Sequence, residues 1–148
     1  MDIDTQAKAY GTGLSVGAIE LTEVIQWADE LISGSDKPSM PLIDLSLTNS
    51  LATAISILNS LAVKPDPQVA AKLLIRHLFK GVTVARISYE HASATLFQMA
   101  LAGEFPDKES EASMWAFSDE LDLANRGTYG EPQTVKQQIL AFLASHAA

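Results

Sequence analysis

The chain of 148 residues has no cysteine, few positive charges and no long apolar run. The absence of cysteine excludes both a disulfide framework and a thiolate metal site. No apolar stretch approaches the roughly 20 residues that cross a bilayer, so no membrane partner is expected. The acidic N-terminus, MDIDTQAKAY, lacks the basic and apolar regions of a secretion signal. We therefore expect a soluble, cytoplasmic protein.

The sequence is also poor in strand signals. It has no Asn-Gly or Asp-Gly hairpin turn and no alternating run of β-branched residues. Apolar residues recur at helical spacing along nearly the whole chain instead. The sequence predicts an all-α bundle of about six helices with short loops, forming one domain over residues 1–148, and it shows no evident internal repeat.

Capping and turn residues mark most of the expected helix ends. Asp66 before Pro67 is a strong helix start, and Gly34 is placed to end an earlier helix. Because of Gly11 and its neighbouring glycine, we expect residues 1–17 to form at most a partial, flexible helix. Residues 82–103 carry apolar side chains on every side, which predicts one central helix.

Negative charge dominates the two ends of the chain. The net charge is −8, from 10 basic and 18 acidic residues. Residues 1–50 and 104–131 each hold eight acids and two bases, whereas residues 51–103 hold two acids and five bases. An acidic surface repels phosphate backbones, so we expect no nucleic-acid partner. The acids suit a basic protein partner, or they serve solubility alone.

The most acidic segment is EFPDKESEASMWAFSDELD, residues 104–122. Acids in the first turn of a helix are favoured by the helix dipole, whereas acids near its C-terminus oppose that dipole and need another explanation. We expect this helix to face inward through Met114, Trp115, Ser118 and Leu121. The candidate partner-binding residues are Glu109, Glu111, Asp119, Glu120 and Asp122.

Two residues are expected to anchor the structure. Asp44 lies in the apolar segment MPLIDLSL, which should form a short helical turn. Its carboxylate could accept backbone N–H bonds at the foot of the next helix or pair with Arg76 or Arg86. A functional role would require a second carboxylate or a histidine nearby, and the local sequence supplies neither. Trp27 continues an apolar helical stripe, so we expect it to be buried.

No catalytic or metal-binding pattern is present. His77, His91 and His146 lack metal-ligand spacing, and we expect His91 to hydrogen-bond at a helix interface. The glycines of GTGLSVG do not match the dinucleotide fingerprint and predict a flexible joint. We expect no metal, no cofactor and no enzymatic activity. The basic stripe of Lys72, Arg76 and Lys80 should face solvent or pair with an acidic neighbour, and a small anion site is the alternative.

VIQWADELI and the later PLIDLSL resemble segments of small uncharacterised all-helical bacterial proteins, over roughly residues 17–50. That resemblance implies no particular activity. In size, acidity and lack of cysteine, the chain is also similar to the immunity proteins that neutralise bacterial toxins. This second resemblance implies an acidic helical face that covers a basic active site.

The sequence therefore favours a non-enzymatic protein-binding module of the immunity type. Two other interpretations stay open. One is a structural or regulatory protein that acts through homo-oligomerisation. The other is an enzyme or small-ligand binder with Asp44, Arg76 and His91 around one pocket. The oligomeric state is not determined by the sequence.

Overall fold

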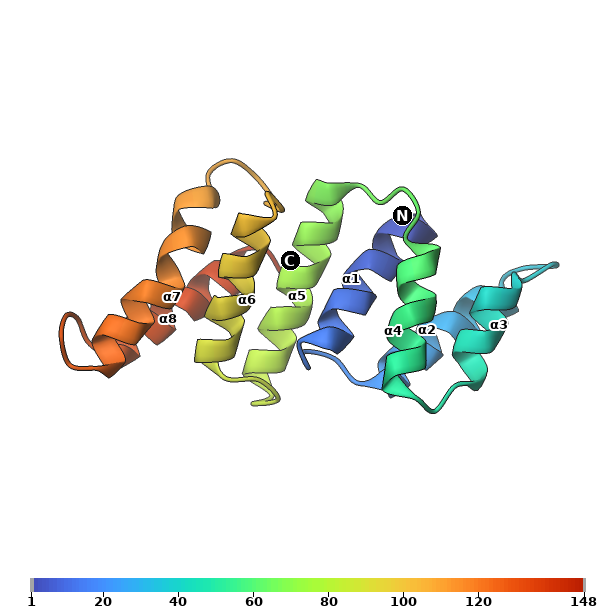
Figure 1. Ribbon diagram of the computed structural model, residues 1–148, viewed down its shortest axis with the longest axis horizontal. Coiled ribbons are helices and arrows are strands. Elements are labelled where there is room, and N and C mark those ends of the chain that lie inside the picture. Colours follow the sequence, from blue (N-terminus) through green and yellow to red (C-terminus); the bar gives the residue numbers. More distant parts are fainter. Residues whose placement is uncertain (1, 148) are drawn as a thin grey trace.

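The computed structural model describes residues 2–147 and contains eight helices and no strand over that range (Figure 1). The all-α prediction is confirmed. The helix count exceeds the expected six because the N-terminal segment is fully helical and MPLIDLSL forms a helix of its own. The helices are α1 (Ile3–Ser15), α2 (Leu21–Ser33), α3 (Met40–Leu47), α4 (Leu51–Leu61), α5 (Pro67–Thr83), α6 (Tyr89–Leu101), α7 (Glu111–Asn125) and α8 (Pro132–Ser145).

The eight helices form two units of four that share three pairs of contacting helices. In the first unit, α1 contacts α4, α2 contacts α3, and α3 contacts α4. In the second unit, α5 contacts α8, α6 contacts α7, and α7 contacts α8. The first unit is centred on one apolar core containing Val24, Leu45 and Leu58, and the second has its own core around Leu96 and Ile139. The packing of α1 against α5 joins the units.

The first two helices of each unit and the turn between them follow the same path, 68 residues apart. GLSVGAI at residues 13–19 is matched by GVTVARI at residues 81–87. The N–H of Ala18 donates to the Gly13 carbonyl at 2.9 Å, and the N–H of Arg86 donates to the Gly81 carbonyl at 2.8 Å. The helices that follow, α2 and α6, start and end at equivalent positions. An internal repeat is therefore present, which corrects the expectation that there was none.

The two units are arranged about an approximate twofold axis. Figure 1 shows α1 and α5 side by side at the centre, with the remaining helices of each unit on opposite sides. On one side α2 lies behind α4, whereas on the other side its equivalent, α6, lies in front of α8. A rotation of 180° about an axis parallel to α1 and α5 exchanges left with right and front with back. The two units differ in this way, so they are related by an approximate twofold rotation.

The N-terminal segment is a complete helix, not the partial helix expected from its glycines. The Asp2 carboxylate caps α1 by accepting the N–H of Thr5 at 2.7 Å. Both glycines in α1 are buried at close contacts. A Cβ on Gly11 would lie 3.3 Å from the Asn59 side chain in α4, and a Cβ on Gly13 would lie 3.2 Å from Ile19. Tertiary packing that requires a small residue outweighs the low helix propensity of glycine.

The segment 82–103 is not one helix. Helix α5 continues to Thr83, the chain turns, and α6 begins at Tyr89. Ala85 lies at the turn with φ of 59°, in the left-handed region where its counterpart Gly17 has φ of 79°. The Ser88 side chain then caps α6 by accepting the N–H of His91 at 3.0 Å. The turn is therefore built in the same way as the joint between α1 and α2.

Candidate functional site

The five acids predicted to bind a partner are all exposed, on α7 and the segment just before it. Asp122 is paired with Arg126, the C-cap residue of α7, with 3.2 Å between its Oδ2 and the arginine Nε. The carboxylates of Glu109, Glu111, Asp119 and Glu120 form no ion pair within residues 2–147. Most of this acidic surface is consequently free to interact electrostatically with a partner.

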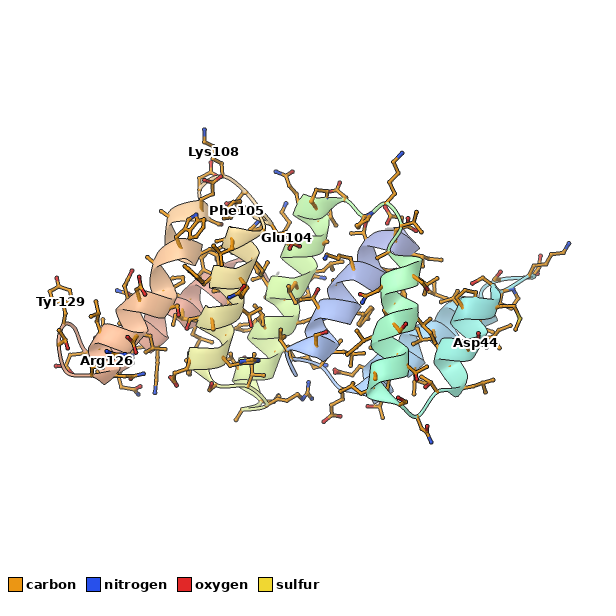
Figure 2. All side chains as sticks on the ribbon, in the orientation of Figure 1. Asp44, Glu104, Phe105, Lys108, Arg126 and Tyr129 are labelled. Atoms are coloured by element: carbon orange, nitrogen blue, oxygen red, sulfur yellow. The ribbon has the colours of Figure 1, made fainter. Side chains whose placement is uncertain are left out.

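An apolar groove lies beside these acids, at the tip where α7 turns into α8. Its volume is about 300 Å³. Leu123 and Tyr129 line it and stay exposed to 39% and 78%, respectively. Glu120 and Glu131 also border the groove, and both are exposed. Figure 2 shows Tyr129 extending from this tip, at the end of the molecule opposite Asp44. Apolar side chains and acids therefore meet at one end of the second unit.

Trp115 was expected to face the core, and this expectation was wrong. It is 41% exposed and packs edge-on against Phe97, with 5.5 Å between the ring centroids. The buried side chains of α7 recur at a spacing of three or four residues, which defines a single helical face. Trp115 is next to Met114 in sequence and thus points about 100° away from that face. The inner face consists of Met114, Phe117, Leu121 and Ala124.

Asp44 does not anchor the backbone, which corrects the prediction. It lies exposed on α3, and its carboxylate has no hydrogen bond or ion pair to any other residue of the range 2–147. The inward positions of this short helix are Leu42 and Leu45, so Asp44 falls on the water-facing side. Nearby, α3 is tied to α2 by a hydrogen bond from the Ser46 hydroxyl to the Asp29 carboxylate.

Trp27 is buried, as predicted, with only 6% of its surface exposed. Its indole Nε1 donates to the Gln6 side-chain oxygen at 3.2 Å. Its ring packs against Tyr10, which packs in turn against His77, with centroid distances of 4.9 and 5.0 Å. Residues of α1, α2 and α5 thus form one continuous series of tilted ring contacts, the ring stack, where the two units meet.

A polar pocket of about 230 Å³ opens at this junction. Glu23 stands at its edge and is neutralised by two bases, forming a hydrogen-bonded ion pair with Lys80 and a second ion pair with Arg86 at 3.4 Å. Burial alone would raise the pKa of the Glu23 carboxyl, but the Lys80 hydrogen bond leads the contacts that lower it. The basic stripe therefore does pair with an acid through Lys80. The lining consists of Tyr10, Ile19, Glu23, Gln26, Trp27, Glu30, His77 and Lys80.

Two titratable groups of the pocket are shifted toward their neutral forms. Burial lowers the pKa of His77 to about 4. The charge of Glu23 opposes this shift, whereas the charges of Arg76 and Lys80 add to it. Burial also raises the pKa of the Tyr10 hydroxyl, as do the nearby carboxylates of Glu23 and Glu30. At neutral pH the pocket therefore presents an uncharged imidazole and an uncharged phenol.

An apolar cleft of about 250 Å³ lies at the equivalent place on the other side of the junction, where α6 takes the position of α2. Glu23, Gln26, Trp27 and Glu30 of α2 line the polar pocket, and the matching positions of α6 line the cleft. Those positions hold His91, Ala94, Thr95 and Gln98. His91 hydrogen-bonds across the units through Nε2 to the Val16 carbonyl at 2.7 Å, as expected for a histidine at a helix interface.

The proposed grouping of Asp44, Arg76 and His91 around one pocket is wrong. His91 lines the apolar cleft, whereas neither of the other two residues does. Arg76 is exposed on α5, and Asp44 lies on α3 at the outer end of the first unit (Figure 2). The polar pocket went unrecognised because its residues come from three helices and share no short motif.

A serine, a histidine and an aspartate also meet between α7 and α8. His146 Nε2 lies 3.1 Å from Asp107 Oδ2 and 3.2 Å from Ser110 Oγ. Ser110 donates from its hydroxyl to Asp107 at 2.6 Å, a bond that leads the contacts lowering the pKa of the Asp107 carboxyl. In a catalytic triad the histidine bridges the two partners through different nitrogens. Here both face the same nitrogen, so the cluster ties the end of α8 to the start of α7.

Within residues 2–147, no group of three or more His, Asp or Glu side chains could hold a metal ion. No helix in the same range is both long and apolar enough to cross a membrane. Comparison of the chain with protein-family models, curated proteins and solved structures finds no match in any of the three.

Proposed function

We propose that this protein is a non-enzymatic binding module that receives a cationic protein segment at the tip formed by α7 and α8. The observation that carries the proposal is the apolar groove of about 300 Å³ beside unpaired acids. Interfaces commonly combine a desolvated apolar centre with a polar rim. Leu123 and Tyr129 offer that centre, and Glu120 with Glu131 offers the rim.

The charge of the surface determines the chemistry of the partner. Asp119 and Glu120 form no ion pair within the described chain, and they stand near the groove on the last turns of α7. Acids in this position oppose the helix dipole, so their presence is not explained by helix stability. A partner with Lys or Arg flanking an apolar side chain would match both features. Its association would be steered by charge and weakened by salt.

An immunity protein that covers the basic site of a toxin is one form of this function. The small size, the acidity and the groove support that interpretation, which rests on analogy of class and charge. A basic toxin-like protein encoded beside this gene would be the natural partner to test first.

The binding test uses a synthetic amphipathic peptide of Lys and Leu, and the same peptide with Glu in place of each Lys. Calorimetry should detect binding of the Lys peptide only, with an affinity that falls as salt increases. Asp119→Asn combined with Glu120→Gln should weaken binding and flatten its salt dependence. Tyr129→Ser should weaken binding while leaving the salt dependence in place, because it removes apolar contact and no charge.

The matched control is Asp36→Asn combined with Asp44→Asn, which changes the net charge equally at the other end of the molecule. This variant should bind the Lys peptide like the wild type. Equal weakening by both double variants would mean that the peptide senses only net charge, and the proposal would fail. Binding that is unchanged in Tyr129→Ser would remove the groove from the interface.

A further inference from the structure

We propose that the polar pocket between α1, α2 and α5 binds a small organic cation with an aromatic or other planar body. The site is separate from the α7–α8 groove and does not depend on the function proposed there. Its volume of about 230 Å³ has room for several waters or one small molecule, since a liquid water occupies roughly 30 Å³. Its walls come from both units, so it exists only when they are joined.

Polar atoms of the pocket are left without partners. Neither the His77 ring nitrogens nor the Tyr10 hydroxyl forms a hydrogen bond within residues 2–147. In the same range, no side-chain nitrogen or oxygen that is sealed from solvent lacks a partner. These atoms are therefore accessible, and both residues line the pocket. They can donate to or accept from a ligand.

The carboxylates of the pocket favour a positively charged ligand. Glu23 is already neutralised by Lys80 and Arg86, but Glu30 has no ion pair within the described range. Glu30 also lies close enough to Tyr10 to raise the pKa of its hydroxyl, so its negative field reaches into the pocket. The positive fields of Arg76 and Lys80 reach His77 on the opposite wall, but Lys80 is held in its ion pair with Glu23. A cation would be attracted to this free carboxylate, whereas an anion would be repelled by it.

The aromatic wall favours a planar body next to that charge. Trp27, Tyr10 and His77 form one stack, and the neutral imidazole adds no competing positive charge. Aromatic rings attract cations and pack well against planar groups. Side chains of this kind at the edge of a pocket are the usual means of recognising organic ammonium groups.

The equivalent cleft in the second unit serves as an internal comparison. Gln98 replaces Glu30, Thr95 replaces Trp27, and Leu78 stands in α5 where Tyr10 stands in α1. The backbone is repeated, but among the described residues that cleft has no counterpart of the ring stack. The carboxylate that lines it, Glu104, forms an ion pair with Lys8 at 3.9 Å. The cation site therefore depends on the particular side chains that α1, α2 and α5 bring to this pocket, not on the repeated fold.

The test follows the indole N–H resonances of the two tryptophans during titration with phenethylamine. Trp27 lines the pocket, whereas Trp115 lies on α7 and serves as a control in the same spectrum. We expect a saturable shift of the Trp27 signal with Kd below about 1 mM, and no saturable shift of Trp115. The neutral isostere 2-phenylethanol and the ring-free cation butylamine should each bind more weakly.

Substitutions separate charge from shape. Glu30→Gln should weaken phenethylamine binding roughly two- to fivefold, as expected for an exposed charge pair, while Glu111→Gln on α7 should leave it unchanged. Tyr10→Leu should weaken binding about tenfold, and Tyr10→Phe, which keeps the ring, should weaken it less. Thermal unfolding of each variant shows whether it is folded at the temperature of titration.

Three results would overturn the proposal. The first is equal affinity for phenethylamine and 2-phenylethanol, which would mean that charge is not recognised. The second is equal weakening by Glu30→Gln and Glu111→Gln, which would reduce the effect to net charge. The third is the absence of any saturable Trp27 shift up to about 10 mM amine, a concentration well above the Kd expected for a site of this kind.

Discussion

The two units share a backbone and differ in chemistry. Their first two helices repeat the helix ends, turn hydrogen bonds and left-handed turn residues at a constant separation. Yet α2 carries Glu23, Trp27 and Glu30 toward its pocket, whereas α6 carries mostly small or neutral side chains toward the equivalent cleft. The outer helices diverge further, since α3 has 8 residues and α7 has 15.

This difference shows which features hold the fold and which are free to change. The features retained in both units are a glycine where the chain folds back, a left-handed turn residue and an isoleucine packed under the turn. Gly13 and Ile19 of the first unit correspond to Gly81 and Ile87 of the second. Function, in contrast, should depend on positions that differ between the units.

Trp27→Ala should give the largest loss of stability. Trp27 is 6% exposed, and its indole N–H donates a hydrogen bond to the Gln6 side chain. The equivalent residue of the second unit, Thr95, is just as buried but has a much smaller side chain. We expect a loss of about 3–5 kcal/mol, measured by chemical denaturation. The control Trp115→Ala removes a ring that is 41% exposed and should cost clearly less. Equal losses would mean that the ring stack contributes little to joining the units.

His77 should make stability depend on pH. Its pKa in the folded protein is about 4, below the value of 6.5 expected for an unperturbed histidine. The unfolded chain therefore binds the proton more readily, and stability should fall as pH decreases from about 6.5 to 4. The full shift corresponds to about 3 kcal/mol. Denaturation midpoints across this range should show a steeper slope for the wild type than for His77→Gln, and an NMR titration of the ring should locate its midpoint.

Substitutions at Gly13 and Gly81, the glycines where the chain folds back, should change stability by an intermediate amount and can be compared directly. A Cβ on Gly81 would lie 3.0 Å from the Ala18 carbonyl oxygen of the other unit, whereas a Cβ on Gly13 would meet only side-chain atoms of Ile19 and His77. We expect Gly81→Ala to lose about 2 kcal/mol because backbone must move. Gly13→Ala should stay within about 1 kcal/mol of the wild type, since side chains can adjust and alanine favours the helix. Equal melting temperatures would contradict this asymmetry.

Replacing the turn residue Ala85 by glycine should change stability by a smaller amount, and should raise it. Ala85 adopts φ of 59°, which costs an L-residue energy that its counterpart Gly17 avoids. Ala85→Gly should therefore stabilise the protein by about 0.5–1 kcal/mol, although glycine also gains freedom in the unfolded chain. Gly17→Ala should destabilise it by a similar amount. A lower melting temperature for Ala85→Gly would show that the turn is not strained.

Much of the fold could be predicted from local signals. Asp66 does cap α5 with Pro67 as its first residue, Gly34 follows α2, and the burial of Trp27 agrees with its apolar stripe. The failures arose where tertiary contacts override local preference. Gly11 and Gly13 predicted a poor helix, but in the structure they allow close packing. The apolar segment from residue 82 contains a turn, and the similarity of residues 81–87 to residues 13–19 is the sequence feature that indicates it.

The sites were harder to predict than the fold. The exposure of the five acids could be inferred from their spacing, but the groove beside them depends on how α7 and α8 meet. The polar pocket combines Tyr10, Glu23 and His77, which are far apart in sequence and come together only through the packing of α1 against α5. Comparison of the two repeated segments would have revealed that α2 is chemically unusual relative to α6.

The smallest expected effect concerns the acidic end of the second unit. Asp119, Glu120 and Asp122 are exposed, and within residues 2–147 Asp122 alone of the three is paired, with Arg126 at the C-cap of α7. Changing them to Asn, Gln and Asn removes repulsion near a helix C-terminus, together with one exposed ion pair of little energetic value. Stability should therefore change by no more than about 0.5 kcal/mol, measured by thermal and chemical denaturation. The partner-binding assay should respond strongly to the same variant, so a large drop in melting temperature would show that these carboxylates maintain the second unit and not its interactions.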